Sequence, residues 1–223
     1  MIPPGGASAR IARGFDRLSP VYDLMADLAF AGRIHASQTV LLPRVPPVRR
    51  ALVMGGGTGR FLAALLEHDR TATAVSIDLS PEMIRRTAHR LETLGLSGRA
   101  ELRIGGIEKL HADERFDLVA TPYFLDLFDD TDLKTVIAGL DRSLESGGHW
   151  LFSDFAVSGR GFPAEVRRSI VAMLYAFFRA ACHIESDHLP DFDRAFHEAR
   201  LSTVDQRGLL GGLLRAALLR KPG

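Results

Sequence analysis

Short apolar runs alternate with amphipathic segments between residue 50 and residue 155. Helical spacing is found over 59–68, 81–94 and 131–145, and the apolar runs of strand length are RALVM, TAVSI, AELRI, FDLVATP and HWLFSDF. Strands that alternate with helices usually pair in parallel and carry the helices on both faces of the sheet. The pattern therefore predicts an α/β fold with a doubly wound, mostly parallel sheet.

The remainder of the chain predicts two further helices and two further strands. The helices are expected from about Pro163 to Cys182 and from Phe192 to Arg200. The apolar runs STVDQR and LLRAALLRK follow and are separated by Gly211 and Gly212. A glycine-containing gap between two such runs is typical of an antiparallel pair. We expect this pair to complete a seven-stranded sheet.

The long helix after residue 163 presents two apolar stripes. One holds Val166, Ile170, Met173, Phe177 and Ile184, and the other holds Val171, Leu174, Phe178 and Cys182. More than one face of the helix therefore seeks burial. The second face is expected either to pack against the core or a second copy in a homodimer, or to line a substrate pocket.

Composition indicates one globular domain with a small N-terminal appendage. Residues 1–13 are rich in glycine, proline and small residues and predict a flexible tail, and 14–45 predict a helical cap that ends at RVPPVRR. Within that cap, Ser19 and Pro20 suit a helix start. The main domain is expected over 46–223, with a helical insertion over 160–200.

Charge and cysteine content exclude several classes of protein. The formal net charge is +1, and the basic clusters are interleaved with acids, so we expect no nucleic-acid partner. Cys182 is the single cysteine, which suits a reducing compartment. No apolar run is long enough to cross a bilayer. These features favour a cytoplasmic protein without membrane insertion.

The stretch VMGGGTGRF lies between the first predicted strand and the first predicted helix. In a doubly wound sheet this turn commonly contacts a ligand, and glycines let the backbone approach it closely. The dinucleotide fingerprint G-x-G-x-x-G fails because its sixth position is Arg60. Asp78 ends the next strand about twenty residues on, where an acid accepts ribose hydroxyls. A nucleoside-containing cofactor is therefore expected, and a turn shaped only by steric needs is the alternative.

Four segments together resemble the class I methyltransferases that use S-adenosylmethionine: LVMGGGTGRF, VSIDLSPEMI, FDLVATPYFLDLF and LESGGHWLFSDF. The turn SGG stands where that family has PGG. The segment FDRLSPVYDLM is similar to the FDxxAxxYD opening of the ubiquinone and menaquinone C-methyltransferase branch. The resemblance covers most of 14–220. It implies a Rossmann-like methyltransferase fold, S-adenosylmethionine as cofactor and methyl transfer as the activity.

The resemblance also implies a set of cofactor-binding residues. The glycine turn falls at the carboxylate and amino end of the cofactor, Asp78 at its ribose and Met83 at its adenine. The full set is Tyr22, Gly55, Gly57, Thr58, Gly59, Asp78, Leu79, Met83, Ile107, Glu108 and Thr121. Two family acids are missing, since Val53 and Gly106 stand in their places. Ser80 and Pro81 are expected to start the helix that contains Met83.

Candidates for the chemistry lie where the fourth strand ends, in TPYFLDLFDD. Asp126 lies where many relatives carry a histidine, Tyr123 and Phe124 suit the flanks of a flat substrate, and His35 is a candidate base. In the alternative reading, the acids 126, 129 and 130 form a loop and cap the next helix. The cluster HIESDH reads as a polar loop, and no metal site is expected.

The sequence thus predicts methyl transfer to a small, apolar or aromatic molecule. The alternative is a non-catalytic binding or regulatory protein with the methyltransferase fold, because two cofactor-binding acids are absent.

Overall fold

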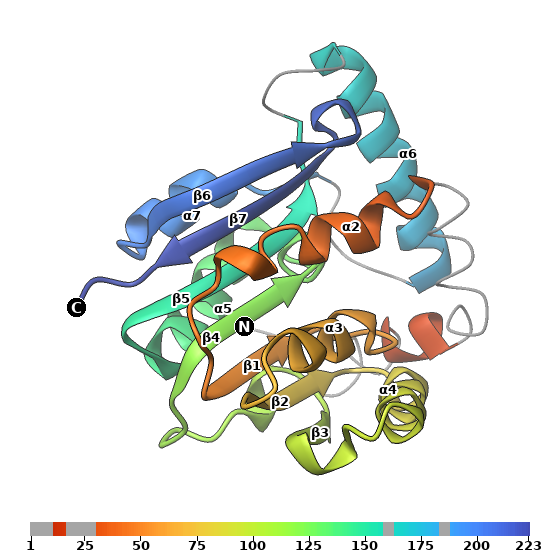
Figure 1. Cartoon of the computed structure of the whole chain (residues 1–223). Coiled ribbons are helices and arrows are strands. Elements are labelled where there is room, and N and C mark those ends of the chain that lie inside the picture. The colour runs from red at the N-terminus through yellow and green to blue at the C-terminus, as the bar shows by residue number, and fades with distance from the viewer. Residues whose placement is uncertain (1–10, 17–29, 158–162, 183–187) are drawn as a thin grey trace.

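A computed structural model describes residues 11–16, 30–157, 163–182 and 188–223 of the chain. Seven strands form one sheet in the order β3-β2-β1-β4-β5-β7-β6 (Figure 1). The strands are β1 (Arg50–Met54), β2 (Thr73–Asp78), β3 (Ala100–Ile104), β4 (Phe116–Pro122), β5 (Leu144–Phe155), β6 (Ser202–Leu209) and β7 (Leu214–Arg220). The predicted doubly wound, seven-stranded sheet is confirmed.

Helices cover both faces of this sheet. They are α2 (Arg33–Thr39), α3 (Arg60–His68), α4 (Pro81–Thr93), α5 (Asp130–Ser143), α6 (Ala164–Cys182) and α7 (Phe192–Glu198), and residues 11–16 are also helical. Figure 1 shows α2 and α3 on one face of the sheet and α5 and α7 on the other. Leu62 of α3 and Val53 of β1 belong to one buried core, and Val136 of α5 and Leu52 of β1 belong to the other. Because successive side chains of a strand point to opposite faces of the sheet, β1 contributes side chains to both cores.

The strand order places the carboxyl ends of β1, β2 and β4 side by side. β1 pairs in parallel with β2 on one side and with β4 on the other, so the strand order reverses at β1. Ligands in open α/β sheets bind at this kind of switch point. The turns after Met54, Asp78 and Pro122 therefore meet at one edge.

The two last strands pair as the sequence predicts. β7 is antiparallel to β5, with Phe152 opposite Ala217, and β6 is antiparallel to β7. Gly211 and Gly212 between them have φ of +61° and +82°, which side chains with a Cβ rarely adopt. The glycine pair therefore permits the tight return of the chain.

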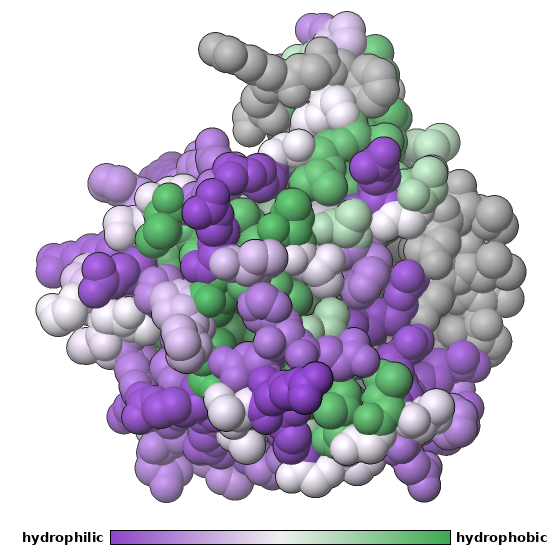
Figure 2. Space-filling view, viewed as in Figure 1, coloured by the Kyte–Doolittle hydropathy of each residue, from purple (hydrophilic) through white to green (hydrophobic). Residues whose placement is uncertain are grey.

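Of the two predicted stripes of α6, the second contributes a buried Val171 and a half-buried Leu174, whereas Val166 and Met173 of the first are exposed. Val171 and Tyr175 pack with Phe30 and Phe155 in a third apolar cluster, whereas Met173 is 64% exposed. Figure 2 shows hydrophobic residues gathered over the upper part of the molecule, where Figure 1 places α6. The side chains of residues 177, 178, 182 and 184 lie outside the described set, as do Ser19 and Pro20. Within the described part of the chain, no helix has the length and apolar character of a membrane span.

Candidate functional site

The turn after β1 is built from glycines in left-handed conformations. Gly55, Gly57 and Gly59 have φ of +67°, +55° and +78°. A Cβ on Gly55 would lie 2.8 Å from Cδ2 of Phe124, so no larger residue fits there. A Cβ on Gly57 would meet nothing within 4 Å. The first glycine thus serves close packing, and the second borders open space.

Side chains of α4 hold this turn in place. The Thr87 hydroxyl donates to the carbonyl of Gly57 over 2.9 Å, and Nε of Arg90 donates to the carbonyl of Thr58 over 2.9 Å. Gly59 is the N-cap of α3 and supplies no side-chain cap. The first N–H groups of a helix have no partner within the helix. The arrangement therefore fixes the turn and presents donors of the kind that bind a carboxylate or phosphate.

Asp78, at the end of β2, joins the glycine turn to the next loop. Its Oδ2 accepts from the backbone N–H of Gly57 and its Oδ1 from that of Ser80, each over 2.9 Å. Burial raises the pKa of Asp78 to about 6, against the two backbone hydrogen bonds that lower it, and the charge of Asp16 raises it further. At neutral pH the carboxylate is mostly ionised and already oriented by the two bonds.

The start of α4 is capped as predicted. Ser80 Oγ accepts from the backbone N–H of Met83 over 3.0 Å, and Pro81 occupies the first turn. Asp16, the first acid of FDRLSPVYDLM and not one of the predicted site residues, accepts from Ser80 Oγ over 2.5 Å and from the backbone N–H of Glu82 over 3.2 Å. Residues 11–16 are thereby attached beside Asp78.

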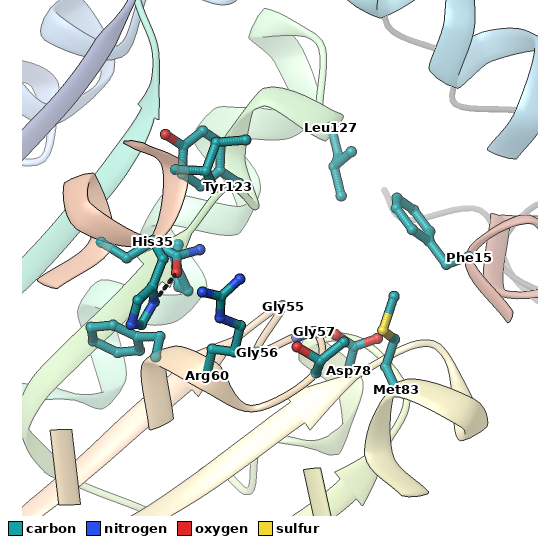
Figure 3. Close-up of a pocket in the computed structure, with 15 residues that line it drawn as sticks. Phe15, His35, Gly55, Gly56, Gly57, Arg60, Asp78, Met83, Tyr123 and Leu127 are labelled. Atoms are coloured by element: carbon teal, nitrogen blue, oxygen red, sulfur yellow. Dashed lines mark hydrogen bonds between the residues drawn. The ribbon is translucent and has the colours of Figure 1, made fainter. Parts of the chain in front are cut away.

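A cleft that is partly open to solvent lies over the turns that follow β1, β2 and β4. Predicted site residues in its walls are His35, Gly55, Gly57, Thr58, Asp78, Met83 and Tyr123. Figure 3 shows Tyr123 and Leu127 across the opening from Asp78 and Met83. Residues that were not among the predicted site residues also line it, namely Phe15, Ile34, Gln38, Gly56, Arg60, Phe61, Pro122 and Leu127. Ile34 and Gln38 come from α2, which none of the quoted motifs covers, whereas the other six lie within those motifs.

Several predicted cofactor residues lie outside those walls. Leu79 is half-buried beside Asp78. Ile107 packs on the core against Gly139 of α5, and the Thr121 hydroxyl is fully buried and accepts from Nε1 of Trp150 over 2.9 Å. The Glu108 carboxylate accepts from the backbone N–H of Gly106 over 2.8 Å. Tyr22 lies outside the described residues.

Tyr123 is held in an unusual backbone conformation. Its φ is +52°, which is uncommon for a residue with a bulky side chain and often accompanies functional sites. Its N–H donates to the carbonyl of Ser153, and its hydroxyl lies 2.7 Å from Oγ of Ser37 on α2. Its ring packs edge-on against Phe155 at 5.1 Å between centroids. His35 lies nearby on α2, with Nδ1 3.4 Å from Oε1 of Gln38.

Asp126 is placed differently from the other two catalytic candidates. Its carboxyl is not part of the cleft wall, and its backbone N–H lies 3.3 Å from Oδ2 of Asp154, a fully buried residue of β5. Burial raises the pKa of both carboxyls, and the charge of Asp126 raises that of Asp154 further. Asp154 was not predicted, although an acid within the apolar run HWLFSDF is a signal for it.

The two neighbouring acids of the same loop have the structural role of the alternative reading. The Asp129 carboxylate accepts from the backbone N–H groups of Thr131 and Asp132 and so caps α5. Asp130, in the first turn of that helix, accepts from the N–H of Asp191 and lies 3.5 Å from Nε2 of His188. The rest of HIESDH lies outside the described residues, within which no three His, Cys, Asp or Glu gather as metal ligands.

Comparison with known proteins agrees with this geometry. Residues 51–148 match the family described as "Methyltransferase domain". The chain is 33% identical over 126 residues to the demethylmenaquinone methyltransferase of Roseiflexus sp. strain RS-1, covering 55% of this chain and 51% of that protein. It is 29% identical over 161 residues to the ubiquinone/menaquinone biosynthesis C-methyltransferase of Pseudomonas savastanoi pv. phaseolicola, covering 70% and 61%. The chain thus spans between half and about three fifths of the length of these relatives.

A solved structure shows the same fold over nearly the whole chain. The N-methyltransferase NodS of Bradyrhizobium japonicum WM9, in complex with S-adenosylhomocysteine, superposes with a TM-score of 0.68 at 20% identity and covers 96% of this chain and 100% of that one. At this identity the match concerns the fold. The sequence matches show a class I S-adenosylmethionine-dependent methyltransferase domain over residues 51–148 and make the chain a distant homologue of the ubiquinone and menaquinone methyltransferases.

Proposed function

We propose that this protein transfers the methyl group of S-adenosylmethionine to a small apolar or aromatic molecule. The observation that carries the proposal is the oriented Asp78 carboxylate, bonded to the N–H of Gly57 at the base of a cleft whose opposite wall includes Tyr123 and Leu127. One side of the cleft suits a nucleoside, and the other side suits a ring or an aliphatic group.

The cofactor side fits a nucleoside that has an amino-acid tail. Asp78 accepts the ribose hydroxyls, Met83 lies next to Asp78 in the wall, and the open space at Gly57 leads to the start of α3. That helix start suits a carboxylate. The two absent acids leave the ammonium and the adenine amine with fewer partners. We assign the adenine amine to Glu108, whose carboxylate is already placed beside Gly106.

The acceptor side is mainly apolar. Phe15, Ile34, Tyr123 and Leu127 line it and also pack on the apolar cluster around Phe155 and Val171. Such walls favour an acceptor that buries apolar surface and is oriented by few polar groups. His35 and Gln38 supply polar atoms at this side.

When bound, the cofactor supplies a methyl group already activated on a positive sulfur. The protein then has to align the acceptor with that methyl group, exclude water and accept a proton where the acceptor has one. Tyr123, fixed at its backbone and hydroxyl, orients the acceptor. His35, which lies in the cleft wall, is the group we propose for the proton; the carboxyl of the other candidate, Asp126, lies outside that wall.

Calorimetry of the purified chain with S-adenosylmethionine, S-adenosylhomocysteine and NAD tests the cofactor assignment. Micromolar binding of the first two without NAD binding is expected, and an absence of binding would refute the proposal. A panel of quinones, phenols and amines with methyl-labelled cofactor then tests transfer. Label in a phenol or quinone supports the acceptor class, whereas label confined to charged amines contradicts it.

A non-catalytic binding or regulatory role is the second candidate, and a specific observation favours it. Val53 is fully buried in β1 and Gly106 is buried after β3, so neither position offers an acid to the cofactor. Each charge-assisted hydrogen bond contributes about 1.5–3 kcal/mol. This candidate predicts that S-adenosylmethionine binding is absent at millimolar concentration, and micromolar binding would remove it.

A further inference from the structure

Helix α2 forms part of the cleft wall, although its own residues give it little stability. Its seven residues follow Gly32, which supplies no side-chain cap, and its first turn holds no acid. A helix of this length is not stable alone, so its position depends on contacts with the rest of the fold. Ile34, His35 and Gln38 of this helix line the cleft. The contact that fixes α2 therefore also fixes one wall of the site.

The buried residue of α2 is a serine. Ser37 is fully buried, whereas the other side chains of Arg33–Thr39 are half-buried or exposed. An apolar side chain is more common in such a position, because a buried hydroxyl is unfavourable unless it is hydrogen-bonded. The Ser37 Oγ lies 2.7 Å from the carbonyl oxygen of Ile34 and 2.7 Å from the hydroxyl of Tyr123. Its hydroxyl thus joins α2 to the residue that follows β4.

The direction of these two hydrogen bonds follows from the number of protons. A serine hydroxyl has one proton and a carbonyl only accepts, so Ser37 donates to Ile34. The hydroxyl of Tyr123 then donates to Ser37. The tyrosine proton is thereby directed toward α2, and the chain of bonds ends at a backbone carbonyl. A phenol held as a donor in this way orients its ring and is not a group that accepts a proton.

The ring of Tyr123 is held from three directions. Besides the bond to Ser37, the backbone N–H of Tyr123 donates to the carbonyl of Ser153 over 2.8 Å, and the ring packs edge-on against Phe155. A positive φ in a bulky residue persists only where the surroundings impose it, as they do here at +52°. Figure 3 shows Tyr123 across the opening from Asp78.

We propose, on the basis of the methyl transfer proposed above, that Ser37 is a positioning residue of this site. Its hydroxyl accepts the proton of Tyr123 and holds the ring that orients the acceptor. Ser37 lies two residues after His35 in the same helix, so the same bond fixes that ring relative to the group proposed for the proton. Loss of either hydroxyl should therefore have the same effect as loss of both.

A double-mutant cycle tests this coupling. Ser37→Ala, Tyr123→Phe and the double variant are compared with the wild type, with methyl-labelled S-adenosylmethionine and an acceptor that the wild type methylates. Each single variant is expected to lower kcat by about tenfold, and the double variant also by about tenfold rather than about a hundredfold. The affinity for S-adenosylhomocysteine should stay within about twofold of wild type. Tyr123→Phe should leave the pH midpoint of kcat unchanged, because the tyrosine proton takes no part in the reaction.

Ser143→Ala is the matched control. Ser143 is also buried, and its Oγ donates to the carbonyl of Leu140 over 2.7 Å at the end of α5, on the other face of the sheet. The control removes the same kind of local bond outside the cleft wall and should keep the wild-type kcat. Additive losses in the cycle, or a shifted pH midpoint in Tyr123→Phe, would overturn the proposal.

Hydrogen exchange measured by mass spectrometry tests the bond without turnover. In the protein alone, the amides of residues 33–39 should exchange at least about fivefold faster in Ser37→Ala and in Tyr123→Phe than in the wild type or in Ser143→Ala. Unchanged exchange in both variants would refute the role of this bond in fixing α2. If the wild type binds no cofactor, the proposed methyl transfer fails and the positioning role fails with it, whereas the exchange rates report separately on the bond.

Discussion

Replacement of Asp78 by asparagine is expected to remove most of the cofactor affinity and all of its pH dependence. Asp78 is the acid at the ribose position, and its two oxygens are oriented by the N–H groups of Gly57 and Ser80. Two hydrogen bonds from ribose hydroxyls to a carboxylate contribute about 1.5–3 kcal/mol each. Asp78→Asn should therefore weaken S-adenosylhomocysteine binding by about 10²- to 10⁴-fold at pH 7.

The pKa of Asp78, about 6, sets the pH range of this effect. Binding needs the ionised form, so wild-type affinity is expected to be constant above pH 7 and about tenfold lower at pH 5. The ionisation of Asp78 affects folding stability with the opposite sign to its effect on cofactor affinity. Because the folded-state pKa is raised, the carboxyl's contribution to stability is complete below pH 4 and is lost as pH rises through 6, by about 3 kcal/mol at most.

Calorimetric titration with S-adenosylhomocysteine at pH 5, 6, 7 and 8 measures the affinities. Glu92→Gln, on the exposed side of α4, is the matched control for loss of one negative charge and should bind as the wild type does. Thermal unfolding confirms that both variants fold. A wild-type affinity that is flat from pH 8 to pH 5, or an Asp78→Asn affinity within threefold of wild type, would refute the reasoning.

Three other substitutions test separate parts of the structure. Gly55→Ala combines a positive φ with close contact to Phe124, so it should lower the free energy of unfolding by more than about 1–2 kcal/mol in denaturant titration. Gly95 has a similar φ and open space around it, so Gly95→Ala should show only the cost of the backbone conformation. Asp126→Asn should raise the free energy of unfolding at pH 8 by at least about 1 kcal/mol and leave it nearly unchanged at pH 4. The reason is that the pKa of Asp126 is raised in the folded state, so the contribution of this carboxyl to stability falls as pH rises. Equal stability of variant and wild type at pH 8 would contradict this. Glu114→Gln should lower the free energy of unfolding at pH 7 by up to about 3 kcal/mol, because hydrogen bonds from Arg103 hold the pKa of Glu114 at about 2. The difference in stability between variant and wild type should shrink as pH falls from 4.5 toward 2. A difference that does not change with pH would rule out this ion pair as the cause.

The sequence pattern predicted the sheet well because each strand carries its own signal. The first four strands agree with their apolar runs to within one residue, and the antiparallel pair was expected from the two glycines before Leu213. β5 begins at Leu144 rather than near His149, because Leu144 pairs with Phe116 across an irregularity in the register. That extension depends on the neighbouring strand and has no local signal.

The site was predicted where its chemistry is local. The glycine turn and Asp78 are about twenty residues apart on adjacent strands, so topology alone brings them together. Ile34 and Gln38 reach the same cleft from α2, which no motif covers. Their placement depends on how helices pack on the sheet, which periodicity does not specify. Asp154, whose carboxylate accepts from the backbone N–H of Asp126, was missed for the same reason, since it is 28 residues away in β5.

The absence of two acids weakens the case for cofactor binding less than their number suggests. Binding free energy is what remains after the cost of ordering the site, and a site ordered in advance loses less. Here Asp78 is held from two sides by backbone N–H groups, and the carbonyls of Gly57 and Thr58 are held by Thr87 and Arg90. The turn therefore needs little rearrangement on binding. The lost charge-assisted bonds and the ordered turn act in opposite directions, so the measured affinity of the wild type decides which of the two dominates.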